Sequence, residues 1–407
     1  MVADAQLDQA YGPLIDWLHE RALVPWKIDA LQQELLGRLH QYGFDIYRMH
    51  IGLPMLHPLY SIGTYNWKQG EGSHQGSYGR GTGQSDVWLK SPVKPVYEAN
   101  LDEHCFRLQD PETEQFPLLV ARRDEGVTEY FVQVAGYFDR SLPIEGQEGV
   151  AMTWSTTQAQ GFSKAQLSFL SRLRLPLAAL VKSLAQRKLT EDILDTYLGS
   201  YSGARVLSGK IQRGDVELID SVILFCDLRG SSNLAKRYSP EAFLDLLNQY
   251  YEITAGVIAE HGGELLRFIG DASLAIFPIQ KFGSARLACQ KALDASREAL
   301  RYCDQFNERR VAQGEPSIHF GIGLHRGEVL YGNMGIPSRL EFTVIGEAAN
   351  EAARIEGMCK ELGESVLVSK AFTECLDGEW VSHGQHRLKH IAAEMALYSP
   401  DFSRRFG

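Results

Sequence analysis

The sequence predicts an α+β protein in which a helical connector joins an N-terminal α/β domain to a C-terminal domain of strands and helices. No acidic residue occurs between Glu148 and Glu191, and leucines recur there at helical spacing, as expected for a connecting helix. Residues 1–160 combine helical leucine patterns with short β-like runs, and residues 216–407 follow the order strand, helix, strand, strand, helix, strand. We therefore expect domains at 1–160 and 216–407, with the connector over 161–215.

Composition narrows the class of protein further. The chain has 407 residues, 44% hydrophobic and 23% charged, as in ordinary globular proteins, and its net charge of −10 argues against binding nucleic acid. No apolar run approaches the roughly 18 residues that a membrane span needs, and the N-terminus lacks the pattern of a secretory signal. Six cysteines without metal-ligand spacing suggest reduced thiols. We expect a cytoplasmic protein with no membrane span and no nucleic-acid partner.

In the N-terminal domain, the clearest helix carries Leu31, Leu35 and Leu39 and should end at Gly43. Strands are expected over 130–137 and 150–156. The glycine-rich stretch 70–83 is expected to be a loop.

The connector should begin at a capping box formed by Ser163 and Gln166. Pro176 should kink or divide the helix that follows. This helix carries a leucine series at a spacing of three and four, namely Leu170, Leu173, Leu177, Leu180 and Leu184. The series fits a short coiled-coil seam between two protomers, and it equally fits a helix packed on its own domain.

The C-terminal domain contains two aspartates in strand and turn contexts that suit a metal site. Asp227 ends an apolar strand and is followed by Leu228 and the small residues Gly230, Ser231 and Ser232, whose backbone N–H groups could line a phosphate. Asp271 follows Gly270 at the tip of a hairpin. Adjacent strands could bring the two carboxylates together, where Mg²⁺ would offset their repulsion.

A later helix over 347–359 carries Asn350 and Arg354 at positions i and i+4, which places both on one face. An arginine fork suits phosphate oxygens better than a lysine does. An ordinary exposed helix face is the plain alternative for such a pair.

Several motifs together resemble the catalytic domain of class III adenylate and guanylate cyclases. They are ILFCDLRGSS at 223–232, GELLRFIGDA at 263–272, TVIG at 343–346 and NEAAR at 350–354. The resemblance covers about 190 residues, in the family's order and spacing. It implies a ferredoxin-like βαββαβ core that works as a head-to-tail homodimer with its sites at the interface.

The resemblance also implies a role for each matching residue. Asp227, Asp271 and the carbonyl of Leu228 match the ligands of two ions per site, Mg²⁺ or Mn²⁺. Asn350 matches the residue that orients the ribose, and Arg354 matches the arginine that stabilises the α-phosphate. The remaining matches are Lys389, which would hold the triphosphate, and Arg267 and Thr343, which fall where the family contacts the base.

The sequence departs from the family pattern at three positions. Ser231 stands where an aromatic residue is usual, His390 where glycine is usual, and Arg267 where adenylate cyclases usually have lysine. Thr343 resembles a subgroup that pairs lysine with threonine, some members of which respond to bicarbonate. Arginine can donate to adenine, yet it is also the usual bidentate partner of guanine.

These observations predict an adenylate cyclase that converts ATP to cyclic AMP and pyrophosphate. A guanylate cyclase and a catalytically inactive nucleotide-binding module remain as alternatives. Residues 1–160 resemble GAF-type sensors in layout, and we expect an unknown small-molecule or other signal there to regulate the catalytic domain through the connector.

Overall fold

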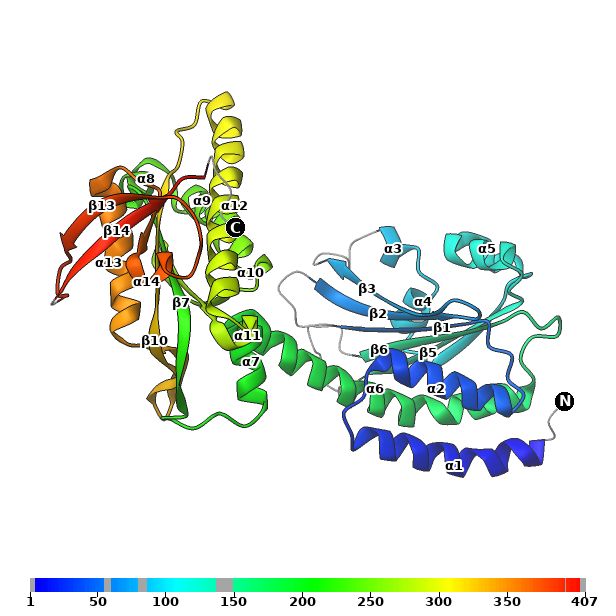
Figure 1. Cartoon of the computed structure of the whole chain (residues 1–407). Helices are drawn as coiled ribbons and strands as arrows, with labels where there is room; N and C mark the ends of the chain where they lie inside the picture. The colour runs from blue at the N-terminus through cyan, green and yellow to red at the C-terminus, as the bar shows by residue number, and fades with distance from the viewer. Residues whose placement is uncertain (1–3, 55–59, 80–85, 137–148, 392, 403–407) are drawn as a thin grey trace. The chain divides into compact units, whose positions relative to one another are not determined.

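A computed structural model describes residues 4–54, 60–79, 86–136, 149–391 and 393–402 (Figure 1). The chain divides into two compact units, Met1–Ile193 and Leu194–Gly407. Each unit is built on its own sheet.

The sheet of the first unit has six strands in the order β3-β2-β1-β6-β5-β4, and every neighbouring pair is antiparallel. The strands are β1 (Arg48–Pro54), β2 (Tyr60–Lys68), β3 (Gly72–Gly79), β4 (Glu103–Arg107), β5 (Glu129–Gly136) and β6 (Gly149–Thr156). β5 and β6 confirm the two strands expected from sequence. The expected loop at 70–83 is wrong for Gly72–Gly79, which pairs with β2 as an edge strand, and residues 80–83 lie outside the described residues.

Helices cover the two faces of this sheet differently (Figure 1). One face carries α1 (Asp4–Ala22), α2 (Ile28–Gln41) and the long α6 (Lys164–Leu198), and the other carries α3 (Asp86–Leu89), α4 (Val93–Glu98) and α5 (Pro117–Asp124). Along β1, Met49 and Ile51 pack into the core shared with α1, α2 and α6. Because side chains alternate along a strand, Arg48, His50 and Gly52 point to the opposite face.

The end of α2 confirms the expected cap at Gly43. Gly43 has a φ of 83°, a left-handed conformation that glycine adopts without the steric cost of a Cβ. The N–H of Phe44 donates to the carbonyl of Leu39 at 3.0 Å, and that of Gly43 donates to His40 at 2.9 Å. This pair of bonds is a Schellman motif, which satisfies carbonyls that the helix end would leave free.

The start of α6 confirms the capping box, because the Ser163 N–H donates to Gln166 Oε1 at 2.9 Å and the Gln166 N–H donates to Ser163 Oγ at 3.1 Å. Pro176 does not divide the helix, which runs unbroken from Lys164 to Leu198. Proline has no N–H to donate to Arg172, four residues earlier. The hydroxyl of Tyr11 on α1 donates to that carbonyl instead, at 2.9 Å.

The coiled-coil interpretation of the α6 leucines is wrong. All five belong to the core of the first unit, with side chains at most 5% exposed, and they are Leu170, Leu173, Leu177, Leu180 and Leu184. They pack with α1, α2 and the sheet, so they cannot also form a seam with another protomer. A spacing of three and four places residues on one helix face, and it is the same for both kinds of partner.

The second unit contains the predicted ferredoxin-like core. Its strands are β7 (Val216–Leu228), β8 (Glu264–Ile269), β9 (Ala272–Pro278), β10 (Phe320–Ile336), β11 (Arg339–Ile345), β12 (Val366–Ser369), β13 (Trp380–Arg387) and β14 (Glu394–Pro400). The sheet order is β13-β14-β12-β10-β7-β9-β8, with β11 paired to β10. Within it, β10-β7-β9-β8 are antiparallel neighbours, which is the βαββαβ arrangement.

The helices of this unit are α7 (Ser200–Leu207), α8 (Ser231–Arg237), α9 (Pro240–Tyr251), α10 (Val257–Glu260), α11 (Ile279–Phe282), α12 (Ala285–Ala312), α13 (Glu347–Leu362) and α14 (Lys370–Thr373). A π-helical turn over Glu252–Gly256 joins α9 to α10. α9, α10 and α12 pack on one face of the sheet, and α13 packs on the other. Gly323 on β10 allows a close approach of α13, because a Cβ there would lie 2.4 Å from the carbonyl oxygen of Ala352.

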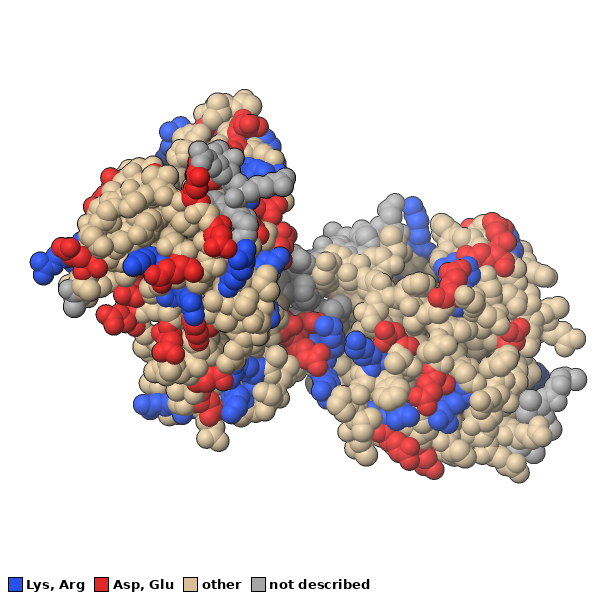
Figure 2. Space-filling model, in the orientation of Figure 1, with Lys and Arg blue, Asp and Glu red and all other residues tan. Residues whose placement is uncertain are grey.

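Two further properties concern the outer surface. Within the described ranges, no helix combines the length and apolar character needed to cross a bilayer. On the face drawn in Figure 2, acidic and basic side chains of the described residues are interspersed in both units.

Candidate active site

Asp227 and Asp271 meet at the paired ends of two central strands. Asp227 lies at the end of β7, opposite Ala272 in the register of β7 with β9. Asp271 immediately precedes Ala272, in the turn that follows Gly270, whose φ of 64° favours glycine. The two carboxyl groups are close enough to share a hydrogen bond when one of them is protonated. The hairpin predicted from sequence therefore brings the pair together.

The surroundings of Asp227 disfavour a bare negative charge. Burial first, and then the charge of and hydrogen bond with Asp271, raise the pKa of Asp227 to about 6, against one lowering contact from the backbone N–H of Leu228. Its Oδ1 is buried without a hydrogen-bond partner among the described residues. A buried carboxylate oxygen without a partner, next to a second carboxylate, is an arrangement that a bound cation would complete.

The donor set also suits a hard divalent cation. Mg²⁺ is commonly held by one or two carboxylates together with phosphates of the substrate and water. Among the described residues, no cluster of three or more His, Cys, Asp or Glu side chains could hold a metal ion. A cation at Asp227 and Asp271 would therefore need further oxygen ligands, such as the Leu228 carbonyl and the phosphates of a nucleotide.

Glu356 on α13 is a third carboxyl group near the aspartates, and the sequence reasoning missed it. Burial first, and then the charges of Asp227 and Asp271, raise its pKa to about 7, while Arg229 acts in the opposite direction. Its closeness to the sheet depends on Gly321, where a Cβ would lie 2.4 Å from Glu356 Oε1. The sequence did contain a signal for Glu356. Its helical spacing from the apolar residues Ala352, Ile355 and Cys359, which are buried, places it on the same side of α13.

Tyr251 is a second residue that the sequence reasoning missed. Its hydroxyl donates to the carbonyl of Gly270, which fixes the turn that carries Asp271. Burial and then the charges of Asp271 and Asp227 raise the pKa of Tyr251. Its ring lies 4.2 Å from that of Phe268, between ring centroids. No motif marks this tyrosine, because its role depends on how α9 packs beside the hairpin.

The small-residue loop after Asp227 leads directly into a helix. Gly230 has a φ of 70°, and α8 begins at Ser231, with Ser232 exposed beside it. The first N–H groups of a helix have no partner within the helix, so the loop can present donors close to Asp227. This placement agrees with the phosphate-lining role expected of Gly230, Ser231 and Ser232, which stays a prediction.

Arg267 lies on β8 and Thr343 on β11, two strands that contact each other without pairing in the sheet, and sequence reasoning missed an acid on β11 that bonds to Arg267. Arg267 on β8 forms an ion pair with Glu341 on β11, at 2.5 Å between Nη2 and Oε2. Glu341 is two residues before the buried Thr343 and points to the same side of β11. The Nε of Arg267 is buried and has no hydrogen-bond partner among the described residues.

Asn350 and Arg354 share one face of α13, as expected, and that face is turned away from the aspartates. Both side chains are exposed, whereas Glu356 and Ala352 lie on the side that packs on the sheet. Helical steps of about 100° put Glu356 on the opposite side of α13 from Arg354. Within the described residues, neither Asn350 nor Arg354 has a hydrogen bond or ion pair with Asp227 or Asp271.

Lys389 follows β13 and is exposed. The preceding Leu388 is buried in a small core with Ile355 of α13, which anchors this turn. His390 has a φ of 64°, a conformation that glycine adopts most readily. The glycine expected here from the resemblance would adopt this conformation freely, whereas His390 adopts it at a steric cost.

The single chain thus forms two separate groups of candidate residues. One contains Asp227, Asp271 and the loop from Leu228 to Ser232, and the other contains Asn350 and Arg354 on the outer face of α13. Arg267 on β8 is joined to β11, the strand that carries Thr343, by its ion pair with Glu341. No described contact joins Lys389 to either aspartate.

The second unit matches a known catalytic family. Residues 216–398 match the family described as Adenylate and Guanylate cyclase catalytic domain. This part of the C-terminal unit is therefore similar to that family, and the ferredoxin-like fold of the unit agrees with the similarity.

Two similar proteins are themselves named as cyclases. The chain is 39% identical over 153 residues to an adenylate cyclase of Anabaena cylindrica, covering 37% of this chain and 29% of that protein. It is 34% identical over 157 residues to adenylate cyclase 1 of Rhizobium meliloti, covering 38% and 23%. The chain thus spans less than a third of the length of these two relatives.

Among solved structures, the adenylyl cyclase CyaB of P. aeruginosa is similar with a TM-score of 0.43 and 23% identity. The similarity covers 47% of this chain and 97% of that one.

Proposed function

We propose that the protein is an adenylate cyclase that converts ATP to 3′,5′-cyclic AMP and pyrophosphate at a metal-dependent site. The observation that carries the proposal is the buried, unpartnered Oδ1 of Asp227 beside Asp271, at the end of the central strands of a cyclase-type domain. A cluster of this kind costs stability unless it serves a ligand.

Asp227, Asp271 and the Leu228 carbonyl would hold two divalent ions, Mg²⁺ or Mn²⁺, whose chemistry is to activate the ribose 3′-hydroxyl and neutralise the triphosphate. Tyr251 keeps the Asp271 turn in place through Gly270. Donors from Gly230 to Ser232 would line the phosphates. Because the attack is intramolecular, the remaining work of the protein is positioning and stabilisation of charge.

Arg354 would stabilise the charge on the α-phosphate, Asn350 would orient the ribose, and Lys389 would hold the triphosphate. Since Asn350 and Arg354 face away from the aspartates of their own chain, these roles require a second protomer. A head-to-tail homodimer would complete each site with one group from each chain.

An exposed apolar row supports association of the catalytic units. Leu218, Leu330 and Ile345 are exposed and lie opposite one another in the registers of β7 with β10 and of β10 with β11. Burying three adjacent large side chains favours association by about 25 cal/mol for each Å² of apolar surface removed from water.

The base is assigned to adenine because Thr343 resembles the threonine of the lysine–threonine subgroup and because the two relatives above are named adenylate cyclases. Guanylate cyclase is the second candidate, and Glu341 favours it. Guanine presents N–H donors on its Watson–Crick edge, and the carboxylate paired with Arg267 can accept them. An inactive nucleotide-binding module is disfavoured, because the chain retains both aspartates and the Asn350–Arg354 pair.

We further propose that residues 1–160 form a sensor, with the GAF-like character expected from sequence, and that they act on residues 216–407 through residues 161–215. The leucines of α6 are buried in the core of the first unit. A signal received by the first unit would therefore reach the catalytic unit through the part of α6 that follows these leucines. Gly199, with a φ of 83°, separates α6 from α7.

The decisive experiment is a direct assay of cyclic nucleotide formation by the purified full-length protein. It should be run with ATP and with GTP, with Mg²⁺ or Mn²⁺ and with chelator. Cyclic AMP that forms only with metal supports the proposal, and the absence of any cyclic nucleotide under all these conditions rejects it.

A further inference from the structure

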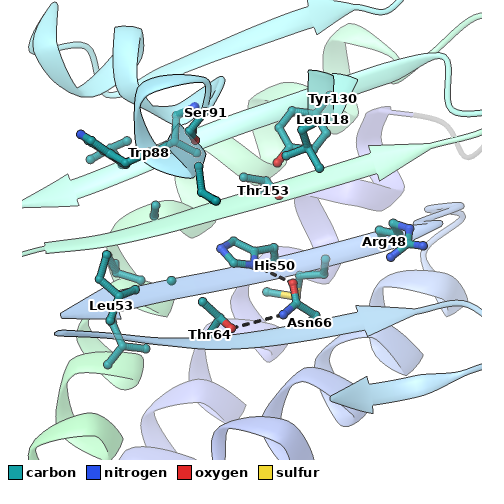
Figure 3. Close-up of a pocket in the computed structure, with 18 of the residues that line it drawn as sticks. Arg48, His50, Leu53, Thr64, Asn66, Trp88, Ser91, Leu118, Tyr130 and Thr153 are labelled. Atoms are coloured by element: carbon teal, nitrogen blue, oxygen red, sulfur yellow. Dashed lines mark hydrogen bonds between the residues drawn. The ribbon is translucent and has the colours of Figure 1, made fainter. Parts of the chain in front are cut away.

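The first unit contains a cavity of about 640 Å³ that has no part in the cyclase site. This volume falls within the range of about 300–1,000 Å³ that is usual for small-molecule sites. The cavity lies on the face of the six-stranded sheet opposite α1, α2 and α6, and Figure 3 shows residues from several strands together with Trp88, Ser91 and Leu118 around it.

The cavity wall is mainly apolar and aromatic. Trp88, Tyr97 and Tyr130 contribute rings, and Leu53 and Leu118 contribute aliphatic surface. Flat aromatic walls favour a planar aromatic guest, which can stack or pack edge-to-face with them.

A row of neutral polar groups crosses the sheet below this wall. Asn66, His50 and Thr153 are direct cross-strand neighbours on β2, β1 and β6. His50 Nδ1 lies 2.7 Å from Asn66 Oδ1, and Asn66 Nδ2 lies 3.4 Å from Thr64 Oγ1 (Figure 3). With the Asn66 oxygen directed at His50, Nδ1 carries the proton and donates, which leaves Nε2 as a hydrogen-bond acceptor.

Nε2 of His50 has no hydrogen-bond partner among the described residues, and space is kept beside it. A Cβ on Gly52 would lie only 3.0 Å from Nε2, so glycine at this position leaves the acceptor open. Burial lowers the pKa of His50, which keeps the imidazole neutral near pH 7.

A second polar group in the cavity wall also lacks a partner. The side chain of Ser155 is 1% exposed and lines the cavity, and its Oγ has no hydrogen-bond partner among the described residues. Buried hydroxyl groups are nearly always hydrogen-bonded, so this one indicates a missing ligand group or water.

The charged residues around the cavity limit which guests it can hold. Arg48 and Arg122 line the cavity, and both form ion pairs with Glu125, at 2.9 Å and 2.5 Å. Their charge is thereby partly offset within the protein, and Figure 3 places Arg48 away from His50, at one end of the group of residues drawn. Lys90 also lines the cavity, but the polar groups on the three central strands, Asn66, His50 and Thr153, are neutral, so a charged guest placed over them would lose its hydration without an opposite charge beside it.

We propose that this cavity binds an uncharged, planar aromatic molecule that donates a hydrogen bond to Nε2 of His50. Such a guest would stack against the aromatic wall and could also satisfy the hydroxyl of Ser155. The proposal concerns binding to the first unit and does not depend on cyclase activity.

A pair of fluorescent probes tests this inference on the full-length protein. 1-Hydroxypyrene has the required flat, neutral ring system and one O–H donor, and pyrene has the same rings without the donor. Titration should show tighter binding of 1-hydroxypyrene by about three- to tenfold, the ratio expected for one net hydrogen bond. His50→Phe should abolish this preference while pyrene still binds, and His19→Phe on the exposed side of α1 should preserve it.

Two further variants locate the binding site. Ala151→Trp, which fills the cavity from β6, should weaken both probes, and Gly52→Ala, which crowds Nε2, should reduce the preference for 1-hydroxypyrene. Thermal melting identifies any variant that fails to fold. No binding of either probe to the wild-type protein would overturn the proposal, as would probe binding unchanged by Ala151→Trp or a preference that persists in His50→Phe.

Discussion

The carboxyl groups of Asp227 and Asp271 face each other across the paired ends of β7 and β9, close enough to share a proton. Their mutual repulsion and the burial of Asp227 raise the pKa of Asp227 to about 6. Without a cation, the folded protein therefore carries an unfavourable charge above that pH.

Because the pKa of Asp227 is raised in the folded protein, Asp227 makes the free energy of unfolding depend on pH, and the uncharged variant Asp227→Asn should lose this dependence. The folded-state pKa of Asp227 is about 6 and its unfolded value is about 3.9, so between these pH values the folded state binds more protons than the unfolded state. The contribution of Asp227 to stability should therefore fall as pH rises from about 4 to about 6 and then level off. In chelator at pH 7, Asp227→Asn should be more stable than wild type by about 1 kcal/mol, a figure that allows for solvent screening of a half-buried group.

Denaturant titrations at pH 4.5 and pH 7 measure this difference. Added Mg²⁺ or Mn²⁺ should raise the melting temperature of the wild-type protein and leave Asp227→Asn nearly unchanged. Asp304→Asn, an exposed change on α12, is the matched control. A variant that gains no stability at pH 7, or that responds to metal like wild type, would show that the pair is not a cation site.

Arg354 lies on the face of α13 that is turned away from Asp227, and this leads to a prediction about the homodimer. If each site takes Asp227 from one chain and Arg354 from the other, Asp227→Ala and Arg354→Ala should each be inactive alone. Mixing equal amounts with subunit exchange should restore about a quarter of the wild-type rate, because half of the dimers are mixed and each of these has one intact site of two. Continued inactivity, with exchange demonstrated by differently tagged chains, would argue for a site within one chain.

The Arg267–Glu341 pair bears on base selection. We expect ATP to exceed GTP in kcat/KM by at least about tenfold, or about 1.4 kcal/mol. If Glu341 instead accepts from guanine, GTP is the better substrate and Glu341→Gln should reduce its use more than that of ATP. The measurement is kcat/KM for both nucleotides in wild type and Glu341→Gln, with the exposed Glu328→Gln on β10 as control. A preference for GTP would change the assigned substrate to guanine nucleotides.

Coupling through α6 can be tested by a helical insertion. One alanine inserted after Arg187, beyond the buried leucines, would rotate the rest of the helix by about 100°. Basal rate or its regulation should change, whereas one glycine inserted after Lys210, in the turn before β7, should have little effect. Equal rates and equal responses in all three proteins would make α6 a passive tether.

Local signals in the sequence were sufficient for several elements. The cap at Gly43, the capping box at Ser163 and the hairpin at Asp271 each depend on residues that are close along the chain. The coiled-coil interpretation was wrong because the spacing of Leu170 to Leu184 is the same for a helix that pairs with another protomer and for one that packs on its own domain. Only the packing of α1, α2 and the sheet against these leucines distinguishes the two.

The residues that were missed depend on distant contacts. Glu356 lies near Asp227 because two glycines on β10 admit α13, and Tyr251 reaches the Asp271 turn from α9. The cavity around His50 requires alternate residues of four strands on one sheet face. No single motif carries such information.

The central claim is that Asp227 and Asp271 support metal-dependent cyclisation of ATP. The most direct measurement is cyclic AMP formation by full-length protein with Mn²⁺ or Mg²⁺, compared between wild type, Asp271→Asn and the control Asp304→Asn. Wild type and Asp304→Asn should form cyclic AMP only with metal, and Asp271→Asn should be slower by at least two orders of magnitude. Turnover by Asp271→Asn close to that of wild type, or equal turnover in chelator, would contradict the claim.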